Sequence, residues 1–373
     1  FAAGPAGRIE RVRALMAERG YDAIVVRDEA NLRWLTGVKG VFDYTFEFPH
    51  AAFITADQCL FHTDSRYLNS FEENTSAGSP WVYDMDEGTI PGWVAGKIAA
   101  NKCRVCAVED DMQINFYQGI QRGLEDRSVA CMLPLMHDDI RKMRAIKDAE
   151  EIELMRHAQS ITDAAFQHML GYIKPGMTEK QVRNELENFM FANGADSLAF
   201  GSIVASGPNT ANPHAVPSDR VIEKGDFVLM DYGAGYCDYR SDMTRTVVMG
   251  EPTQEQLDLY ALVRRAHEEC VAAIHPGVEG NDIFKLSKKI IGDAGYGDYY
   301  NHGLGHGVGI DIHELPNFNR SKNIIEVGSV ITMEPGVYLP GVGGVRLEDY
   351  GVVTENGYEP FTKTPHDLHV IDC

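Results

Sequence analysis

The sequence predicts a mixed α/β domain over residues 1–137, followed by an α+β domain over residues 138–373 that contains an internal pseudo-two-fold repeat. Three observations support this prediction. The 373 residues exceed the roughly 250–300 at which single hydrophobic cores stop growing. Helical and extended patterns alternate in the first part. The second part runs helix, helix, strand, strand twice, which is typical of helices that cover a curved, largely antiparallel sheet.

The amino-terminal domain begins with a helix over residues 5–19, because Ile9, Val12 and Met16 recur at helical spacing and Gly20 ends the pattern. Short apolar runs between turn residues then predict strands. The further elements expected here are a strand over 22–26, a helix over 29–35, paired strands over 51–55 and 59–63, and a strand over 104–109.

Apolar residues at helical spacing predict one long helix over residues 138–170, and we place the domain boundary at its start. An I-x-P-G turn follows. Thr178 and Gln181 then have the spacing of a capping box, in which each side chain bonds the other's backbone N–H, and they open a helix over 179–192. The same order returns later, with helices over 255–273 and 280–293 around a second I-x-P-G turn.

One motif occurs twice. The pattern E-x-G-x-x-x-M-[DE]-x-G spans Glu223–Gly233 and again Glu326–Gly336, and such repeats indicate duplicated structural units. In each copy an apolar run predicts a buried strand that ends in an acid, and an R-x-acid step follows. If the two halves pack face to face, four carboxylates converge: Asp231, Asp242, Glu334 and Glu348.

The segment from Asn301 to Pro316 is rich in glycine and histidine. It matches neither the G-x-G-x-x-G nor the G-K-[ST] pattern of phosphate loops, so we expect its glycines to let the backbone approach a site closely. His306 is a candidate nitrogen ligand beside the four acids. In a continuous strand, His313 would face the opposite side from His306. His214, in a proline-bounded loop before the first acid, is a further candidate.

Clustered carboxylates repel one another and cannot all stay ionised without cations. Few Lys and Arg residues surround Asp231 in the sequence, so metal ions are serious candidates. Two divalent ions would supply the missing positive charge. Four carboxylates and one imidazole suit Mn, Co, Fe or Zn more than copper.

The composition narrows the class of partner. A net charge of −21 disfavours nucleic acid and anionic membranes. No apolar run approaches the ~18–20 residues of a membrane-spanning helix. Residues 1–7 have neither the basic region nor the apolar stretch of a signal peptide. Seven scattered cysteines, with Cys103-x-x-Cys106 as the one C-x-x-C pair, predict buried free thiols. We therefore expect a cytoplasmic protein.

These motifs together resemble those of the "pita-bread" metallopeptidases, the family of Xaa-Pro dipeptidase (prolidase), Xaa-Pro aminopeptidase and methionine aminopeptidase. The resemblance covers essentially the whole chain, with a creatinase-like domain over 1–137 and the catalytic domain over 138–373. It implies a homodimer, with the amino-terminal domain in the interface. It also implies Mn or Co as the metal.

The resemblance assigns a role to each candidate residue. Asp231 would hold one metal ion, and Asp242 and Glu348 would bridge both. His306 and Glu334 would hold the other, with a hydroxide between the metals as the nucleophile. Glu334 would also move protons. The remaining assignments are His214 and His313 as catalytic residues at the substrate carbonyl, and His302 and Arg346 near the substrate.

The substrate implied by the family is a small peptide with proline at the second position. Phe200, Tyr232 and Tyr338 are candidates to line a proline pocket. The dipeptidase is slightly favoured, because a short loop separates Glu334 from Glu348, and the aminopeptidase stays open. Two other classes remain: a non-peptidase hydrolase of this fold acting on a small modified amino acid, and a catalytically silent binding protein, which would lose metal ligands.

Overall fold

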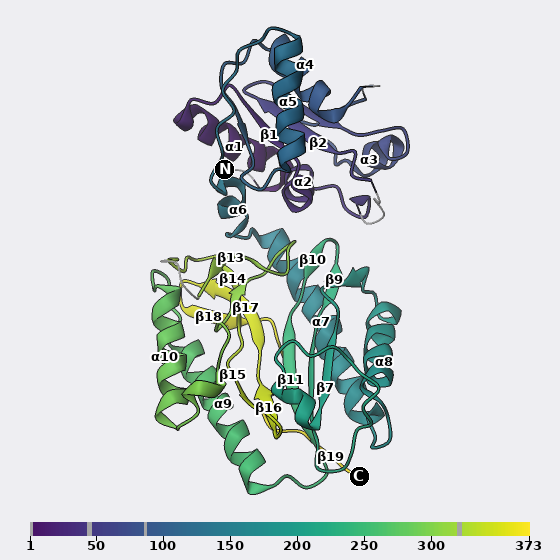
Figure 1. The fold of residues 1–373 in the computed structure, drawn as a ribbon, viewed down its shortest axis with the longest axis vertical. Coiled ribbons are helices and arrows are strands. Elements are labelled where there is room, and N and C mark those ends of the chain that lie inside the picture. Colours follow the sequence, from purple (N-terminus) through teal and green to yellow (C-terminus); the bar gives the residue numbers. More distant parts are fainter. Residues whose placement is uncertain (1–2, 43–46, 86–87, 319–322) are drawn as a thin grey trace. The chain divides into compact units, whose positions relative to one another are not determined.

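The computed structural model describes residues 3–42, 47–85, 88–318 and 323–373. It divides into two compact units, Phe1–Arg144 and Ala145–Cys373 (Figure 1). We placed the boundary after residue 137. In the structure the short helix α6, Asp139–Arg144, groups with the first unit, because Arg144 Nη1 donates to Asn31 Oδ1 at 2.8 Å. The predicted fold class, α/β followed by α+β, is confirmed.

The first unit contains a five-stranded sheet in the order β4-β3-β2-β1-β5. β1 pairs antiparallel with β2 and parallel with β5. Val25, Phe53 and Trp93 belong to its buried core. The strands are β1 (Ala23–Val26), β2 (Ala51–Thr55), β3 (Cys59–His62), β4 (Val82–Asp84) and β5 (Cys106–Val108), and the further helices are α1 (Gly4–Arg19), α2 (Glu29–Thr36), α3 (Leu68–Asn74), α4 (Ile90–Ala100) and α5 (Ile114–Asp126).

The second unit carries two main sheets, in the orders β19-β11-β8-β7 and β13-β12-β14-β17-β18. Figure 1 shows α7 and α8 beside the first sheet and α9 and α10 beside the second. The helices are α7 (Ala149–Tyr172), α8 (Glu179–Ala192), α9 (Gln254–Ala272) and α10 (Gly280–Asp293), with short 3₁₀ turns η2 (Gly207–Ala211) and η3 (Gly297–Tyr299). The capping box at Thr178 and Gln181 is confirmed.

The strands of the second unit are mostly short. They are β6 (Ser197–Leu198), β7 (Ile203–Ser206), β8 (Phe227–Tyr232), β9 (Ala234–Tyr236), β10 (Tyr239–Arg240), β11 (Met243–Met249), β12 (His306–Gly307), β13 (Glu314–Asn317), β14 (Val330–Met333), β15 (Gly336–Leu339), β16 (Gly343–Arg346), β17 (Asp349–Thr354), β18 (Gly357–Pro360) and β19 (Val370–Ile371).

The prediction of a single helix over 138–170 was wrong. The helical pattern is interrupted between α6 and α7, where Ile146 forms a β-bridge with Ser329 and the Lys147 N–H bonds the Gly328 carbonyl. Asp148 then caps α7 in a capping box with Glu151. Tertiary pairing and a strong cap therefore override the apolar periodicity.

The internal repeat is visible in the backbone pairing. Thr178 forms a bridge with Val221, and Glu279 forms the equivalent bridge with Ile324. In the first half β8 pairs antiparallel with β11, and in the second β14 pairs antiparallel with β17. The two halves meet where Thr244 forms an antiparallel bridge with Glu348. The repeat thus places the ends of both strand pairs next to each other.

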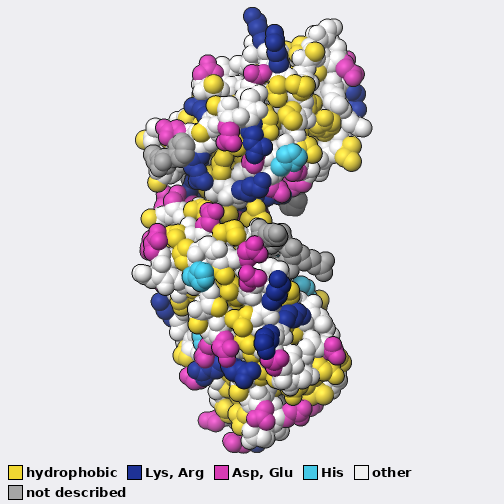
Figure 2. All heavy atoms as spheres, turned by 90° about the vertical axis from the view of Figure 1, so that its left-hand side faces the viewer, with side chains coloured by type: hydrophobic (Ala, Val, Ile, Leu, Met, Phe, Trp, Pro, Cys, Tyr) yellow, Lys and Arg dark blue, Asp and Glu magenta, His cyan; other side chains and the backbone are white. Residues whose placement is uncertain are grey.

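Figure 2 views the side of the second unit that carries α9 and α10, and side chains of both charge signs are interspersed there. On α9 they form pairs four residues apart, such as Arg264 with Glu268 and Arg265 with Glu269. The opposite face of α9, including Leu259 and Val263, is buried. In the part of the chain that the structure describes, we find no helix with the length and apolar character to cross a bilayer.

All seven cysteines are free, as predicted, but Cys131 and Cys237 are only partly buried and Cys373 is exposed. Cys103 and Cys106 are free and buried, and Cys106 lies on β5. Burial raises the pKa of the Cys103 thiol to about 11, so this thiol is held in its unreactive protonated form.

Candidate metal centre and its cavity

The four repeated acids all lie at strand ends of the second unit. Asp231 is near the end of β8 and Asp242 directly precedes β11. Glu334 directly follows β14 and Glu348 directly precedes β17. The antiparallel pairing within each half and the bridge between the halves bring these ends together. All four side chains line one cavity of about 490 Å³, which lies within the usual size range of ligand pockets.

His306 completes the group. Its Nε2 lies 3.2 Å from Glu334 Oε1 and 3.5 Å from Asp242 Oδ2. One ligand-type atom each from Asp242, His306 and Glu348 lies within 4.8 Å of the others. The Nδ1 of His306 is 2.9 Å from the Gly307 carbonyl, so Nδ1–H donates and Nε2 faces the carboxylates. This tautomer is the one in which Nε2 can bind a metal ion.

Three of the four carboxylates are unfavourably placed for ionisation, whereas the pKa of Glu334 is lowered to about 2, because the effect of burial is outweighed by its hydrogen bond with His306 and by nearby positive charges. Burial, followed by the neighbouring carboxylate of Asp231, raises the pKa of Asp242 well above its usual value. Burial and Asp242 do the same for the pKa of Glu348. Burial also raises the pKa of Asp231, although Arg346 opposes that shift. Divalent cations would remove this penalty.

One atom tests directly whether the residues fit a metal. Asp231 Oδ2 accepts from Arg346 Nη2 at 2.7 Å, whereas the buried Oδ1 has no hydrogen-bond partner among the described residues. A buried carboxylate oxygen without a partner is costly. Together with four carboxylates and an imidazole facing one cavity, it is the arrangement that a divalent ion would satisfy. The residues therefore fit the metal centre.

The other predicted site residues line the same cavity: His214, His302, His313 and Arg346. The ring centroids of His306 and His313 are 4.3 Å apart. A continuous strand would have separated them, but β12 ends at Gly307 and the chain bends before His313. Burial lowers the pKa of His302 and of His313, so both rings are held neutral.

The glycines of this segment are explained by close backbone packing. A Cβ on Gly305 would lie 2.2 Å from the Thr332 carbonyl oxygen, and one on Gly307 would lie 2.2 Å from that of Leu315. No side chain fits at such distances, so glycine lets the His306 segment pass between its neighbours.

Two family models match the chain. "Metallopeptidase family M24" matches residues 153–355, and "Creatinase/Prolidase N-terminal domain" matches residues 8–146. The chain belongs to metallopeptidase family M24. It is therefore an enzyme, and its family implies divalent metal ions. This agrees with the family resemblance seen in the sequence.

Several relatives of this M24 metallopeptidase match over nearly their full length. A "Xaa-Pro dipeptidase" of Pyrococcus horikoshii is 42% identical over 362 residues, covering 97% of this chain and 98% of the relative. The solved Xaa-Pro dipeptidase from Bacillus anthracis is 36% identical, with a TM-score of 0.90, covering 98% and 100%. The X-Pro aminopeptidase from Thermotoga maritima is 31% identical, with a TM-score of 0.86, covering 98% and 100%.

The M24 metallopeptidase also holds its acids with hydroxyl groups that the sequence interpretation missed. Thr244 Oγ1 donates to Glu348 Oε2 at 2.6 Å, and Thr332 Oγ1 donates to Glu334 Oε1 at 3.2 Å. One signal could have found them. Each threonine lies two residues from a predicted ligand, Thr244 after Asp242 and Thr332 before Glu334, and residues two apart on a strand share a face.

The aromatic candidates separate into different environments. Phe200 lines the cavity. Tyr232, the last residue of β8, does not, because its side chain is fully buried in the core and its hydroxyl donates to the Thr162 carbonyl. Tyr338 acts through its hydroxyl, which accepts from Arg346 Nη1 at 2.9 Å and lies 2.7 Å from His302 Nε2. The strand pattern alone could not reveal which way each ring points.

Proposed function

We propose that this M24 metallopeptidase hydrolyses the peptide bond before proline, using two divalent ions held by Asp231, Asp242, His306, Glu334 and Glu348. The observation that supports this most strongly is the convergence of these five side chains on one cavity. When bound, the ions would activate a water molecule as nucleophile and stabilise the anionic intermediate. Asp242 and Glu348 would serve as ligands to both ions.

The cavity wall suits a proline ring. Beside the polar group it is lined by the apolar side chains Phe200, Ile203, Pro213 and Ile312. An Xaa-Pro bond is a tertiary amide without an N–H. A site that recognises it therefore gains more from apolar contact than from a hydrogen bond to the amide nitrogen. The relatives named Xaa-Pro dipeptidase and X-Pro aminopeptidase support the same substrate class.

Two of the three histidines, His214 and His313, would act as hydrogen-bond donors to the substrate. His313 and His302 are held neutral, and a neutral imidazole donates from one nitrogen only. His302 Nδ1 is 2.7 Å from the Gly303 carbonyl and donates to it, so its Nε2 accepts from the Tyr338 hydroxyl. We therefore assign the substrate carbonyl to His313 and His214, proton transfer to Glu334, and the wall of the substrate site to His302 and Arg346.

The test uses two substrates and the metal-loaded enzyme. We expect cleavage of Ala-Pro, of Ala-Pro-Ala or of both in the presence of Mn²⁺ or Co²⁺, which are the proposed ions. Cleavage of Ala-Pro alone would identify a dipeptidase, and cleavage of Ala-Pro-Ala an aminopeptidase. No cleavage of either would contradict the proposal. Asp242→Ala should lose more than about 100-fold in kcat/KM, because removing groups that merely support ligands already costs 10–100-fold.

Two further properties complete the proposal. We propose a homodimer and a cytoplasmic location. Light scattering of the purified protein measures the mass in solution, and a monomeric mass would contradict the first. Fractionation of the cells that produce the protein tests the second.

A further inference from the structure

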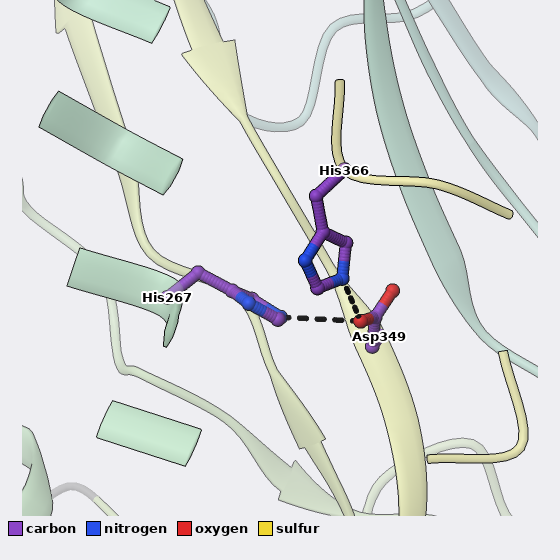
Figure 3. A group of neighbouring side chains, drawn as sticks. All are labelled: His267, Asp349 and His366. Carbon is purple, nitrogen blue, oxygen red and sulfur yellow. Dashed lines mark hydrogen bonds and ion pairs between the residues drawn. The ribbon is translucent and has the colours of Figure 1, made fainter. Parts of the chain in front are cut away.

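A second group of side chains of the types that bind metal ions lies at β17, the strand that directly follows Glu348. His267 on α9, Asp349 on β17 and His366 in the segment before β19 point toward one another (Figure 3). Each offers one ligand-type atom, and these atoms lie within 4.8 Å of one another. The Nε2 atoms of His366 and His267 are 2.5 Å and 3.6 Å from Asp349 Oδ2. Both imidazoles therefore converge on the same carboxylate oxygen.

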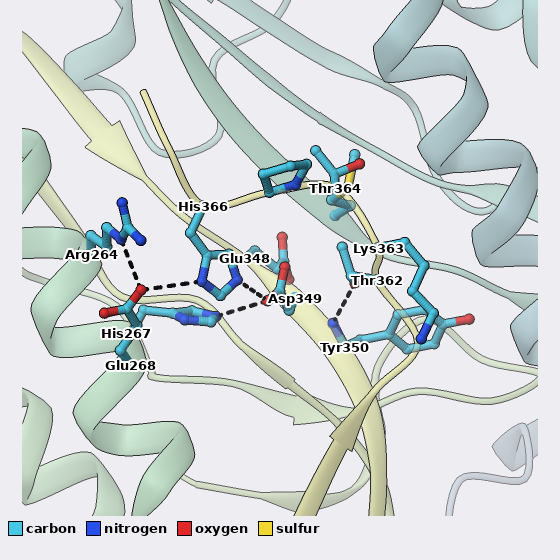
Figure 4. A network of polar contacts seen from close by, with 12 residues as sticks. Arg264, His267, Glu268, Glu348, Asp349, Tyr350, Thr362, Lys363, Thr364 and His366 are labelled. Atoms are coloured by element: carbon cyan, nitrogen blue, oxygen red, sulfur yellow. Dashed lines mark hydrogen bonds and ion pairs between the residues drawn. The ribbon is translucent and has the colours of Figure 1, made fainter. Parts of the chain in front are cut away.

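Arg245 does not compete for that oxygen, which the two imidazoles share. Arg245 Nη2 binds the other oxygen, Asp349 Oδ1, at 2.7 Å. His366 Nδ1 lies 3.4 Å from Glu268 Oε1, and Arg264 holds Glu268 at 2.8 Å (Figure 4). A carboxylate at the far nitrogen of a histidine is the usual support for a metal-binding imidazole, since it fixes the ring and its tautomer.

His267 supplies an independent observation. Its residue is fully buried, yet neither ring nitrogen has a hydrogen-bond partner among the residues that the structure describes. Buried polar atoms without partners are rare, and an ion or water at the group is a common explanation. Burial lowers the pKa of His267 to about 4, so this imidazole is neutral near pH 7, whereas the hydrogen bond with Asp349 raises the pKa of His366, whose proton a bound ion would have to displace. Neutral imidazole is the form that binds metal ions.

We propose that His267, Asp349 and His366 form a third metal site, which would bind Zn²⁺ and is separate from the proposed catalytic pair. Two imidazoles, one carboxylate and a water in the fourth position are a common tetrahedral zinc set. The ion would replace the proton shared by His366 and Asp349, and those atoms would move to about 3 Å apart, since zinc–ligand bonds are about 2.0–2.2 Å. The His366 side chain is 28% exposed, which gives the ion a path of entry.

The proposed site lies against β17, on the side away from the cavity that Glu348 lines. Glu348 lines the cavity, whereas its neighbour Asp349 points to the other face of the strand, where α9 packs. Arg245 connects the two faces, because its Nη1 donates to the Glu348 carbonyl oxygen at 2.7 Å. Zinc at this site would therefore join α9, β17 and the carboxyl-terminal segment behind a proposed catalytic ligand. Its role is structural.

Metal counting tests the proposal. The variant Asp242→Ala/His306→Ala removes ligands from both catalytic positions, and after equilibrium dialysis against Zn²⁺ we expect one ion per chain to remain, measured by atomic emission. Adding His366→Lys should remove that ion, because lysine keeps a cation beside Asp349 but withdraws the imidazole. Adding His275→Ala, which removes an exposed histidine from the same unit, should retain it.

Each outcome of the metal count either supports the proposed zinc site or contradicts it. No ion in the doubly substituted protein, or an ion that persists after His366→Lys, would overturn the site. Circular dichroism shows that each variant is folded. Zinc K-edge absorption of the retained ion gives a second measurement that needs no further substitution: the proposal expects two imidazole ligands at about 2.0 Å, and a spectrum with oxygen ligands alone would contradict it. Neither measurement depends on peptidase activity.

Discussion

The ammonium of Lys147 lies 2.6 Å from Oε1 of Glu314, and both side chains are almost completely buried. Lys147 stands just before α7, and Glu314 directly follows His313. Glu314 Oε2 also accepts the Asp311 N–H at 3.3 Å. The ion pair therefore connects the beginning of the catalytic unit to the bend that orients a proposed catalytic histidine.

Lys147→Met should destabilise the second unit and lower activity together. Removing one partner of a buried ion pair costs about 3–5 kcal/mol, because it leaves a buried charge without compensation. Thermal unfolding and kcat/KM measure the two effects. Arg156→Met is the matched control, because Arg156 pairs with Glu359 at the surface and such pairs contribute about 0–1 kcal/mol. Equal melting temperatures for the two variants would contradict the assignment.

Thr244→Val should weaken metal binding while the fold is retained. The substitution keeps the shape of the side chain but removes the hydroxyl that donates to Glu348 Oε2. Loss of such a supporting group usually costs 10–100-fold in metal affinity or activity. Titration with Mn²⁺ measures the affinity. Thr246→Val is the control, because its hydroxyl bonds the Arg346 backbone instead. If both variants bind metal equally well, the hydroxyl of Thr244 has no supporting role.

Tyr338→Phe should reduce kcat/KM about tenfold, or about 1.4 kcal/mol in transition-state stabilisation, and leave metal content unchanged. Burial raises the pKa of Tyr338 to about 12, so its hydroxyl stays protonated and donates to His302 while accepting from Arg346. Without that hydroxyl, both substrate-facing side chains lose a fixed partner. Kinetics combined with metal analysis separates this effect from ligand loss, and a fall in bound metal would argue against it.

The first unit should lose stability in mild acid through His50. This residue is fully buried among aromatic rings, and burial lowers its pKa to about 4. Between pH 6.5 and 4 the imidazole of His50 is therefore protonated in the unfolded chain but neutral in the folded chain. The contribution of His50 to the free energy of unfolding should fall by up to about 3 kcal/mol as the pH decreases through this window, which the comparison with a variant at this position isolates.

Urea unfolding followed by tryptophan fluorescence measures this loss, because all three tryptophans, Trp34, Trp81 and Trp93, lie in the first unit. His50→Phe should flatten the pH dependence. His137→Asn, at an exposed histidine with positive φ that asparagine tolerates, should not. Parallel pH curves for the parent and His50→Phe would contradict the prediction.

Much of the architecture could be predicted because it depends on patterns of residues that are close together in the sequence. The capping box at Thr178 and the repeated motif around Asp231 and Glu334 are short-range signals, and the structure has a helix and strand pairs at those places. The break before α7 could not be predicted, since it depends on pairing between Ile146 and Ser329, far apart in sequence.

The candidate site likewise contains residues that the sequence could predict and residues that it could not. Acids and histidines stand out in a sequence because few structural roles require them buried together. The side chains that hold them do not, because Thr244 and Lys147 are ordinary residues until the fold shows what they contact. The orientation of Tyr232, into the core and not the cavity, likewise depends on the register of β8 with β11.

The bridge between Thr244 and Glu348 joins two halves that each contribute two acids to one centre. Neither half alone holds the complete set of proposed ligands, so the proposed ions would bind only after both halves have folded and met. Their binding free energy is then added to the stability of the assembled unit. Activity would thus depend on correct folding. A chain whose two halves have not packed together would not bind the metal ions and would not hydrolyse peptides.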